Sequence, residues 1–342
     1  MKRYFLECVA PGRMEVQCSP MTGPGEHEVT VQTTVSAISP GTEMLVYRGQ
    51  WPEGVSLDSS IEALTGSFSY PVAYGYCAVG KVVELGSGVS SDWIDRRVFA
   101  FQPHQSHFHA PISSLEIVPD DIDDETALFL PGMETAITLM LDGRPIIGET
   151  VVVIGQGIIG LLTTAMLCRF PLHSLTTLDR YPLRREASLR LGARDSFDPE
   201  EPGLFERLGA VVGRGGESDL VYELSGNPEC LNDALALVRY TGRVVVGSWY
   251  GTKTGALDLG SFFHRGRITL ISSQVSNLPP ELSGRWNKRR RLETAWDMLA
   301  TISPASLITH RFELQDGARA YAIIDRDPGA SIQVIFDYRD GS

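Results

Sequence analysis

The chain is predicted to be an α/β protein that joins a doubly wound parallel sheet to a second domain rich in β-strands. Its 342 residues suffice for about two domains. Short apolar segments separated by turn residues occupy the first third, a pattern typical of a barrel or sandwich. From about residue 150, strand patterns alternate with helix patterns, which indicates a parallel sheet covered on both faces.

The elements of the first third are predicted from alternation and from turn residues. Residues 29–35 place valines at every second position except one, as a half-buried strand requires. The acidic run 120–125 is interpreted as a solvated loop ahead of a helix, whose N-terminus favours anions. Further short strands are expected at Lys81–Leu85, Arg97–Phe101 and Leu115–Val118.

The rest of the chain is predicted to alternate strands with helices. Thr150–Ile154 is a continuous β-branched run followed by an apolar helix. From about Thr294 to Tyr338 the pattern mixes one amphipathic helix with short strands such as Ser331–Phe336. Additional strands are expected at Ser174–Leu178, Asp219–Leu224, Arg243–Gly247 and Ile268–Ser272, and helices at Leu183–Leu191 and Pro228–Tyr240.

Composition excludes several classes of function. The chain has 42 acidic against 30 basic residues and a net charge of −12, so no nucleic-acid or anionic-membrane partner is expected. Its five scattered cysteines form no CxxC pair, which favours reduced thiols and a cytoplasmic location. Glu7 interrupts any signal-peptide core, and the charge-free stretch 151–168 is broken by three glycines. The chain is therefore expected to be soluble.

The strongest functional signal is Gly155-Gln156-Gly157-Ile158-Ile159-Gly160, which lies between a buried strand and an apolar helix. This context is the one that the dinucleotide fingerprint requires. Gly155 permits a tight turn, Gly157 lets the backbone approach a pyrophosphate, and Gly160 allows the helix to pack on the strand. Asp179 follows the second strand, where a carboxylate accepts hydrogen bonds from an adenosine ribose. The sequence predicts a nicotinamide dinucleotide cofactor.

The choice between the two nicotinamide dinucleotides depends on the same region. Asp179 would repel a 2′-phosphate, which favours NAD(H). Arg180 and Arg184 lie close by in the sequence and could compensate, so NADP(H) stays open. Further cofactor contacts are expected at strand ends, from Ser225, Gly247, Ser248 and Ser272.

Several motifs together resemble the medium-chain dehydrogenase/reductase superfamily over nearly the whole chain. They are Gly80-Lys81-Val82-Val83-Glu84-Leu85-Gly86, Asp95-Arg96-Arg97-Val98, Glu223-Leu224-Ser225-Gly226 and Gly242-Arg243-Val244-Val245-Val246-Gly247. The resemblance implies a chaperonin-10 (GroES)-like β-barrel with the substrate site, at residues 1–127 and 278–342. It implies a Rossmann domain at residues 128–277, an NAD(P)-dependent oxidoreductase, and a homodimer or homotetramer.

The chain departs from the zinc-dependent members of that superfamily at each catalytic zinc ligand. Ser39 or Pro40 replaces the expected cysteine, Tyr76 the histidine, and Leu130 the glutamate. These side chains cannot form a tetrahedral zinc site, and the four-cysteine structural lobe is also missing. The remaining histidine cluster is interpreted as surface or substrate-pocket residues rather than ligands; it comprises His104, His107 and His109. We expect a protein without zinc.

Within the superfamily, two motifs are most similar to the hydroxyethyl bacteriochlorophyllide dehydrogenase branch. They are Ile38-Ser39-Pro40-Gly41-Thr42-Glu43 and Tyr70-Pro71-Val72-Ala73-Tyr74-Gly75-Tyr76. That branch also has Gly-Tyr where zinc enzymes have Gly-His. The tetrapyrrole substrate is not transferred to this chain on these motifs.

Without zinc, some hydrogen-bond donor of the protein must polarise the substrate carbonyl or accept the alcohol proton. Thr42 matches the family position that relays this proton, and Tyr76 is a candidate donor if the cofactor's positive ring lowers its pKa. A turn hydroxyl and a packed aromatic are the competing interpretations of these two residues. Glu43 is a third candidate, and both it and Glu134 are expected to pair with His or Arg. Thr135 is a candidate contact on the nicotinamide side.

The predicted function is zinc-independent interconversion of a secondary alcohol and a carbonyl by hydride transfer. Reduction of an activated alkene by the same fold stays open, as does a catalytically inactive NAD(P)-binding protein with a redox-sensing or structural role. The basic run 285–291 is either an exposed helix start, balanced by Glu293 and Asp297, or a mouth that guides an anionic small-molecule substrate.

Overall fold

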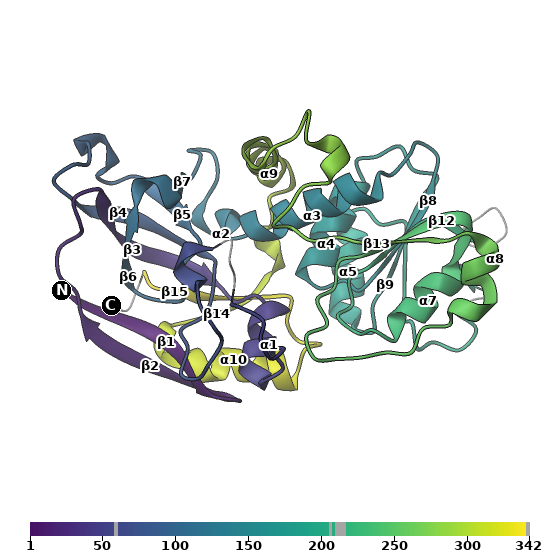
Figure 1. The fold of residues 1–342 in the computed structure, drawn as a ribbon, viewed down its shortest axis with the longest axis horizontal. Coiled ribbons are helices and arrows are strands. Elements are labelled where there is room, and N and C mark those ends of the chain that lie inside the picture. The colour runs from purple at the N-terminus through teal and green to yellow at the C-terminus, as the bar shows by residue number, and fades with distance from the viewer. Residues whose placement is uncertain (58–60, 205–206, 209–216, 340–342) are drawn as a thin grey trace. The chain divides into compact units, whose positions relative to one another are not determined.

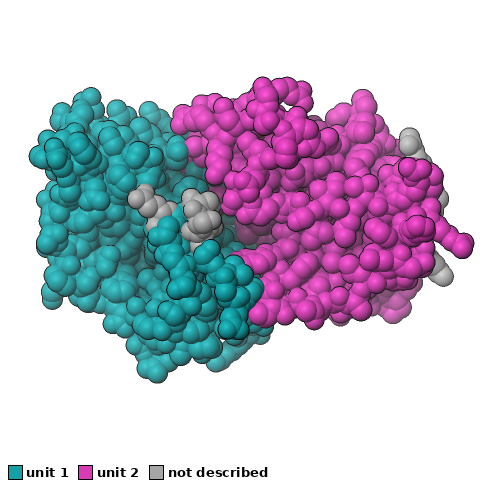
Figure 2. Space-filling model, viewed as in Figure 1, with its two compact units in different colours: residues 1–130, 303–342 teal, residues 131–302 magenta. Residues whose placement is uncertain are grey.

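The chain divides into two units (Figure 2), one built mainly from antiparallel strands and the other from parallel strands (Figure 1). The computed structural model describes residues 1–57, 61–204, 207–208 and 217–339. Unit 1 comprises residues 1–130 and 303–342, and unit 2 comprises residues 131–302. Residues 278–302 were expected in the first domain, but they belong to unit 2. Arg291 of this segment forms a buried ion pair with Glu134, which belongs to the same unit.

Unit 1 is organised around β3 (Glu28–Ala37), whose valines fill the core as their alternation predicts. Along one edge β3 pairs with β4 (Ala78–Leu85). Along the other it pairs first with β6 (His107–Pro111) and then with β15 (Gln333–Asp337), which comes from the C-terminal segment and is yellow in Figure 1. The sheet order is β14-β15-β3-β4-β5-β7, so the two ends of the chain share one sheet.

The remaining elements of unit 1 are short, and a two-stranded sheet of β1 and β2 is separate from the main one. Asp123 accepts a hydrogen bond from the Thr126 amide and caps α2, so the acidic run leads into a helix as predicted, although its last two residues, Asp124 and Glu125, already belong to that helix. The elements are β1 (Lys2–Ala10), β2 (Arg13–Pro20), α1 (Thr42–Arg48), β5 (Arg97–Ala100), β7 (Leu115–Ile117), α2 (Asp124–Ala127), β14 (Ile308–Phe312) and α10 (Gly317–Arg326).

Unit 2 contains a six-stranded parallel sheet in the order β10-β9-β8-β11-β12-β13. This is the doubly wound arrangement, in which the strand order reverses beside the first strand, β8. Both β8 and β9 are completely buried, as their uninterrupted apolar and β-branched sequences predict. The strands are β8 (Thr150–Ile154), β9 (Ser174–Leu178), β10 (Asp195–Phe197), β11 (Ser218–Glu223), β12 (Val238–Val246) and β13 (Thr269–Ser272).

The helices of unit 2 follow the strands, with one clear difference from prediction. The helix expected over Pro228–Tyr240 is α7 and ends at Leu237, because Val238 begins β12 and pairs with Ser218 of β11. The helices are α3 (Leu130–Gly143), α4 (Ile158–Leu167), α5 (Pro182–Arg190), α7 (Cys230–Leu237), α8 (His264–Gly266) and α9 (Lys288–Ile302).

The predicted fold class is confirmed: a Rossmann-type parallel sheet is combined with a domain of mainly antiparallel strands. The charge-free stretch 151–168 divides between β8, the glycine loop and α4. In the part of the chain that the structure describes, no helix has both the length and the apolar character needed to cross a membrane.

Candidate functional site

The turn between β8 and α4 can be built only with glycine at two positions. Gly155 has a φ of +90°, and a Cβ there would lie 2.6 Å from backbone atoms of Leu224 and Ser225, just after β11. A Cβ on Gly160 would lie 1.9 Å from the carbonyl oxygen of Gly155. Both distances are too short for any side chain, so these glycines let the loop turn and bring α4 against the strand.

Gly157 differs from the other two glycines because it faces open space. It caps α4 with an ordinary φ of −65°, and the nearest atom to a built Cβ is the Arg184 Nη1 at 4.0 Å. No side chain caps the helix, and no acidic residue lies in its first turn. Ile158 and Ile159 are partly exposed beside it. The first amides of α4 therefore offer a positive helix end to an anion such as a pyrophosphate.

Asp179 follows β9 directly and is 7% exposed. Its Oδ2 accepts a hydrogen bond from the Gln156 amide at 2.7 Å, and its Oδ1 accepts one from the Tyr181 amide at 2.8 Å. Because a carboxylate oxygen has two lone pairs, each oxygen can still accept a hydrogen bond from a ribose hydroxyl. Asp179 thus fits the predicted ribose contact and also holds the glycine loop.

Gln156 was predicted as a cofactor contact, but its side chain is buried in the interior of unit 2. The Gln156 Nε2 donates to the Gly155 carbonyl at 3.1 Å, and its Oε1 accepts from Thr164 Oγ1 at 3.0 Å. The backbone amide of Gln156 also donates to Asp179, so Gln156 supports the glycine loop from the interior of unit 2. The pattern could not reveal this, because it specifies only the glycines.

The two arginines beside Asp179 occupy different surroundings. The guanidinium of Arg184 packs over the Tyr181 ring at 4.9 Å and lies next to Gly157. Burial lowers the pKa of Arg184, while the nearby Asp179 carboxylate opposes that shift. Arg180 is exposed and pairs with Glu200 at 3.1 Å. Of the two, Arg184 lies nearer to the predicted phosphate position.

The loops after β11 and β12 are joined by a buried carboxylate that the motif analysis did not assign. Glu223 Oε1 accepts from the Ser225 amide at 2.8 Å and from the Ser225 hydroxyl, and Oε2 accepts from Tyr250. Ser248 Oγ accepts from the Gly226 amide at 2.9 Å. Predicted contacts Ser225 and Ser248 therefore order these two loops.

The remaining predicted contacts at the strand ends are Gly247 and Ser272. A Cβ on Gly247 would lie 2.6 Å from Leu224 Cδ2, so packing alone accounts for the glycine. Ser272 is exposed at the last residue of β13.

Three hydroxyl groups lie together in unit 1. Tyr76 donates a hydrogen bond to Ser39 Oγ at 2.6 Å, and the Thr42 side chain lies near enough to Tyr76 to lower its pKa. All three residues are partly exposed. We call Ser39, Thr42 and Tyr76 the hydroxyl cluster. Two of its members, Thr42 and Tyr76, were predicted as catalytic, and the structure brings them together.

The protein surroundings of Tyr76 raise its pKa, and the predicted lowering by the cofactor's positive ring stays a prediction. Burial of its hydroxyl raises the pKa of Tyr76 to about 12, against the weaker opposing effect of the Ser39 and Thr42 side chains. The phenol is therefore protonated at neutral pH. Tyr76 can donate a hydrogen bond or a proton without first being ionised.

Glu43, the third predicted catalytic residue, is 1% exposed. Its Oε1 accepts from the Ser39 amide at 2.7 Å, and its Oε2 accepts from Tyr321 and lies 3.0 Å from His104 Nε2. The expected pairing with a histidine is present. Since both oxygens are engaged inside unit 1, direct contact of Glu43 with a substrate is not supported.

The three histidines of the predicted cluster do not act as a group. His104 is fully buried, so its interpretation as a surface or pocket residue was wrong; its Nδ1 lies 2.7 Å from Ser36 Oγ. The two nitrogens of His109 are 3.1 Å from Thr30 Oγ1 and 3.0 Å from the Thr22 carbonyl. His107 is partly exposed and hydrogen-bonds to the neighbouring Ser106.

Glu134 pairs with an arginine, as expected. Arg291 places Nη2 3.0 Å and Nε 3.1 Å from Glu134 Oε1, and its Nη1 donates to Thr138 Oγ1 at 3.1 Å. Within the basic run 285–291, Arg291 therefore stabilises unit 2 and does not belong to an exposed basic surface. Arg285 and Lys288 are exposed, as a guiding surface would require. Thr135 donates to the Pro131 carbonyl within its own helix at 2.9 Å.

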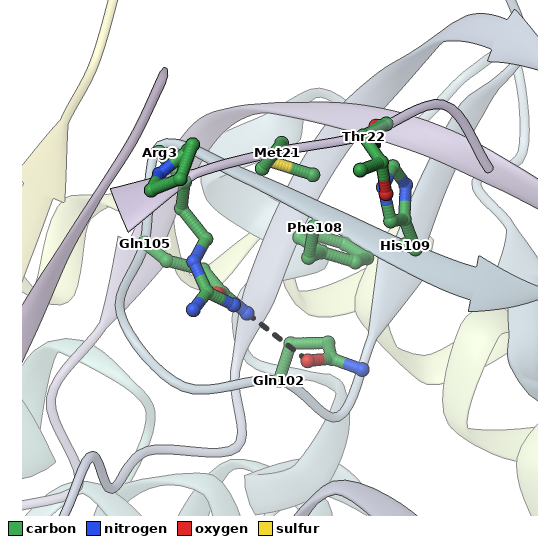
Figure 3. Close-up of a pocket in the computed structure, with 8 residues that line it drawn as sticks. Arg3, Met21, Thr22, Gln102, Gln105, Phe108 and His109 are labelled. Carbon is green, nitrogen blue, oxygen red and sulfur yellow. Dashed lines mark hydrogen bonds between the residues drawn. The ribbon is translucent and has the colours of Figure 1, made fainter. Parts of the chain in front are cut away.

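A surface pocket of about 310 Å³ lies on unit 1 away from the hydroxyl cluster (Figure 3). Its polar groups largely satisfy one another: Gln105 Nε2 donates to Gln102 Oε1 at 3.1 Å, and Arg3 Nη1 donates to Gln105 Oε1 at 3.3 Å. Met21 and Phe108 supply apolar surface. The pocket includes no predicted catalytic residue, and we do not assign a substrate to it.

The chain has the fold of the medium-chain dehydrogenases/reductases, with the glycine loop in its parallel-sheet unit. Residues 159–299 match the zinc-binding dehydrogenase family. D-guloside 3-dehydrogenase of Escherichia coli strain K12 is 22% identical over 329 residues, covering 90% of this chain and 92% of its own.

Two solved structures share the fold over 98% of this chain and 99% of their own, each at 18% identity and a TM-score of 0.78. One is an alcohol dehydrogenase, rspB, from Escherichia coli CFT073 in complex with NADH. The other is a zinc-binding dehydrogenase homologue from Sinorhizobium meliloti 1021 bound to NADP.

Proposed function

We propose that the chain is a metal-independent, NAD(H)-preferring oxidoreductase that interconverts a secondary alcohol and a carbonyl compound. The observation that carries this proposal is the hydroxyl cluster. Tyr76 stands at the sequence position where zinc-dependent members of the superfamily have a histidine, Ser39 or Pro40 stands where they have a cysteine, and here Tyr76 hydrogen-bonds to Ser39. The phenol is a hydrogen-bond donor beside two other hydroxyls, and a positive nicotinamide ring that lowered its pKa toward neutrality would make it an efficient general acid and base.

The residues of unit 2 fit a nicotinamide dinucleotide. The α4 amides and Gly157 would hold the pyrophosphate, and Asp179 would accept hydrogen bonds from the adenosine ribose. The Asp179 carboxylate supports NAD(H), although Arg184 nearby leaves room for NADP(H). Relatives of known structure bind NADH in one case and NADP in the other. When bound, such a cofactor accepts or supplies a hydride.

The corresponding side chains of unit 1 do not fit catalytic zinc. Cys77 is buried and donates its thiol to the Leu128 carbonyl at 2.8 Å, and burial raises the pKa of Cys77, so it stays a thiol. Leu130 is buried and has no ligand atom. Within the described ranges, no group of three or more His, Cys, Asp or Glu residues is placed to hold a metal ion. The family match at residues 159–299 does not include these positions.

The protein's own contribution to the reaction is to manage the proton. In carbonyl reduction, Tyr76 donates its phenolic proton to the substrate oxygen as the carbon receives the hydride. A proton passing along Ser39 or Thr42 from water then restores the phenol. In alcohol oxidation the same path runs in reverse, and the substrate hydroxyl proton leaves through the hydroxyl cluster to water. General acid–base catalysis of this kind contributes about 10²- to 10⁴-fold to a rate.

The test is a panel of alcohols, ketones and enones assayed at 340 nm with NADH, NADPH and their oxidised forms. Turnover of an alcohol–ketone pair by protein that contains less than stoichiometric zinc supports the proposal. Turnover of enones alone would identify an alkene reductase instead, and tight NADH binding without any turnover would identify an inactive cofactor-binding protein. Stoichiometric zinc in active protein, measured by elemental analysis, would contradict metal independence.

The variant Tyr76→Phe tests the role of the phenol directly. We expect kcat to fall by at least about 100-fold, while the Kd for NADH stays unchanged because Asp179 and Gly157 are intact. Tyr4→Phe removes a hydroxyl from a tyrosine that is 37% exposed in the same unit and serves as the matched control. If Tyr76→Phe retained the wild-type kcat, the phenol would not be the proton donor.

A further inference from the structure

We infer that Glu43, His104 and Tyr321 are positioning residues that hold the hydroxyl cluster in its catalytic geometry. This inference rests on the proposed function, because it assigns a role to groups behind the proposed proton donor. None of the three contacts a substrate in this scheme. They act through the backbone of Ser39 and the first turn of α1, which carries Thr42.

The carboxylate of Glu43 is the centre of this arrangement. It comes from the first turn of α1 and turns back to accept the Ser39 amide, closing the loop of residues 39–43. A carboxylate in this position fixes the entry of the chain into a helix in the manner of a capping residue. Since Tyr76 donates to Ser39 Oγ, the same loop fixes the partner of the phenol. Displacing Glu43 would move both Ser39 and Thr42.

A buried carboxylate needs donors to compensate for the loss of water. Glu43 accepts from the Ser39 amide, from the Tyr321 hydroxyl and from His104 Nε2. Burial and the Glu43 charge raise the pKa of Tyr321, so this residue remains a donor at physiological pH. The three donors come from separate parts of unit 1: the loop before α1, the loop between β5 and β6, and α10.

The hydrogen bonds of His104 connect Glu43 to Ser36 and Tyr338, and one choice of donors satisfies the whole chain of bonds. Ser36 Oγ lies 2.7 Å from His104 Nδ1 and 3.0 Å from the Tyr338 hydroxyl. If Tyr338 donates to Ser36 and Ser36 donates to Nδ1, the His104 ring carries its proton on Nε2 and presents it to Glu43. The ring also packs against Gly75, where a Cβ would lie 3.0 Å from His104 Nε2, directly before Tyr76. His104 therefore supports Glu43 and borders the Tyr76 backbone.

Steady-state kinetics of three variants tests the positioning role. Glu43→Gln and Tyr321→Phe are expected to lower kcat by about 10- to 100-fold, because small displacements of a catalytic group are costly. Their KM is expected to change less than about threefold, and their Kd for NADH not at all. The control is Tyr47→Phe, since Tyr47 packs its ring 5.5 Å from that of Tyr321 without contributing to the Glu43 hydrogen bonds. Thermal unfolding of the three variants shows whether each still folds.

Proton NMR of ¹⁵N-histidine-labelled protein tests the arrangement without turnover. A slowly exchanging Nε2–H signal of His104, assigned by its loss in His104→Phe, is expected to shift in Glu43→Gln and to keep its position in Tyr47→Phe. If the signal does not respond to Glu43→Gln, the inference is wrong. It is equally wrong if folded Glu43→Gln and Tyr321→Phe retain wild-type kcat. It is also wrong if kcat falls as much in the control Tyr47→Phe as in those two variants. If the wild-type protein turned over no substrate, the proposed function would be refuted. The NMR experiment would still report whether His104 donates to Glu43.

Discussion

At the residue scale, Asp179 holds the glycine loop in place and is also the predicted contact of the adenosine ribose. Its carboxylate accepts the amides of Gln156 and Tyr181 and so connects the glycine loop to the end of β9. The same two oxygens have lone pairs left for a ribose diol. The loss of this side chain should therefore affect both the shape of the phosphate loop and the contact with the nucleoside.

The variant Asp179→Ala is expected to weaken NADH binding by at least about 10-fold, as hydrogen bonds to a charged group contribute about 1.5–3 kcal/mol each. NADPH binding should weaken less, because the repulsion of a 2′-phosphate is removed at the same time. Fluorescence titration of both cofactors measures the two effects. Glu200→Ala, which removes the exposed partner of Arg180, is the control and should change neither Kd more than about twofold. Equal affinity of wild type and Asp179→Ala for NADH would place the ribose elsewhere.

At the element scale, two glycines at the start of α4 are expected to have different roles: Gly160 in packing and Gly157 in cofactor binding. A Cβ added to Gly160 would lie 1.9 Å from the Gly155 carbonyl oxygen. A Cβ added to Gly157 would have no neighbour closer than Arg184 Nη1 at 4.0 Å. Gly160→Ala is expected to lower the free energy of unfolding by at least about 3 kcal/mol through overpacking. Gly157→Ala should fold normally but bind NADH at least about 10-fold more weakly, since its methyl group occupies the approach of the pyrophosphate.

Urea unfolding and NADH titration of this pair of variants distinguish the two roles of glycine. The reverse outcome, a stable Gly160→Ala and an unstable Gly157→Ala, would contradict the described geometry of the loop. A Gly157→Ala variant that binds NADH as tightly as wild type would show that the pyrophosphate does not approach this residue.

The helix α9 is held in unit 2 by Arg291, whose side chain is 5% exposed, and Glu134, at 9%. Arg291→Met removes one partner of this buried pair and is expected to cost about 3–5 kcal/mol in the free energy of unfolding. Arg289→Met removes an exposed pairing with Glu293 and should cost less than about 1 kcal/mol. Chemical denaturation of both variants makes the comparison. Equal stability losses would mean that Arg291 does not anchor α9.

The sequence was sufficient to predict those elements and site residues that are close together along the chain. Residues 150–154 and 174–178 were predicted with their observed bounds, and the glycine loop lies within ten residues of β8. By contrast, His104 and Tyr321 lie 61 and 278 positions from Glu43, so no local pattern could join them. The hairpin of β1 and β2 was missed because its charged and apolar residues alternate weakly. The similarity to the bacteriochlorophyllide branch stays a prediction, as does the cytoplasmic location.

At the scale of the whole molecule, β13 ends the parallel sheet, and in the described part of the chain only β12 pairs with it. Leu270 in this strand is 39% exposed. Trp249, which follows the neighbouring strand β12 in the chain, is 45% exposed. An edge strand with unpaired backbone groups and exposed apolar side chains is suited to pairing with the same strand of a second copy. The homo-oligomer stays a prediction, and this edge is the surface on which we expect it to form.

We expect the protein to form dimers or larger even-numbered oligomers, and Leu270→Lys to shift them toward monomers. A lysine on an edge strand opposes strand pairing because its charge would be buried against its own copy. Light scattering coupled to size-exclusion chromatography measures the mass. Ile94→Lys alters an apolar residue that is 43% exposed in unit 1 and is the control. A monomeric wild type, or a Leu270→Lys variant that keeps its mass, would contradict this interface.

The shared sheet of unit 1 has a consequence for the order in which the protein is made. Unit 2 is one continuous segment, whereas unit 1 needs residues from both sides of it. β15 pairs with β3 only after nearly the whole chain has been synthesised, and Tyr321 reaches Glu43 equally late. During translation, unit 2 can therefore fold while the N-terminal strands still wait for their last neighbours. All residues of unit 2 are thus synthesised before β15, the strand that completes the unit carrying the hydroxyl cluster.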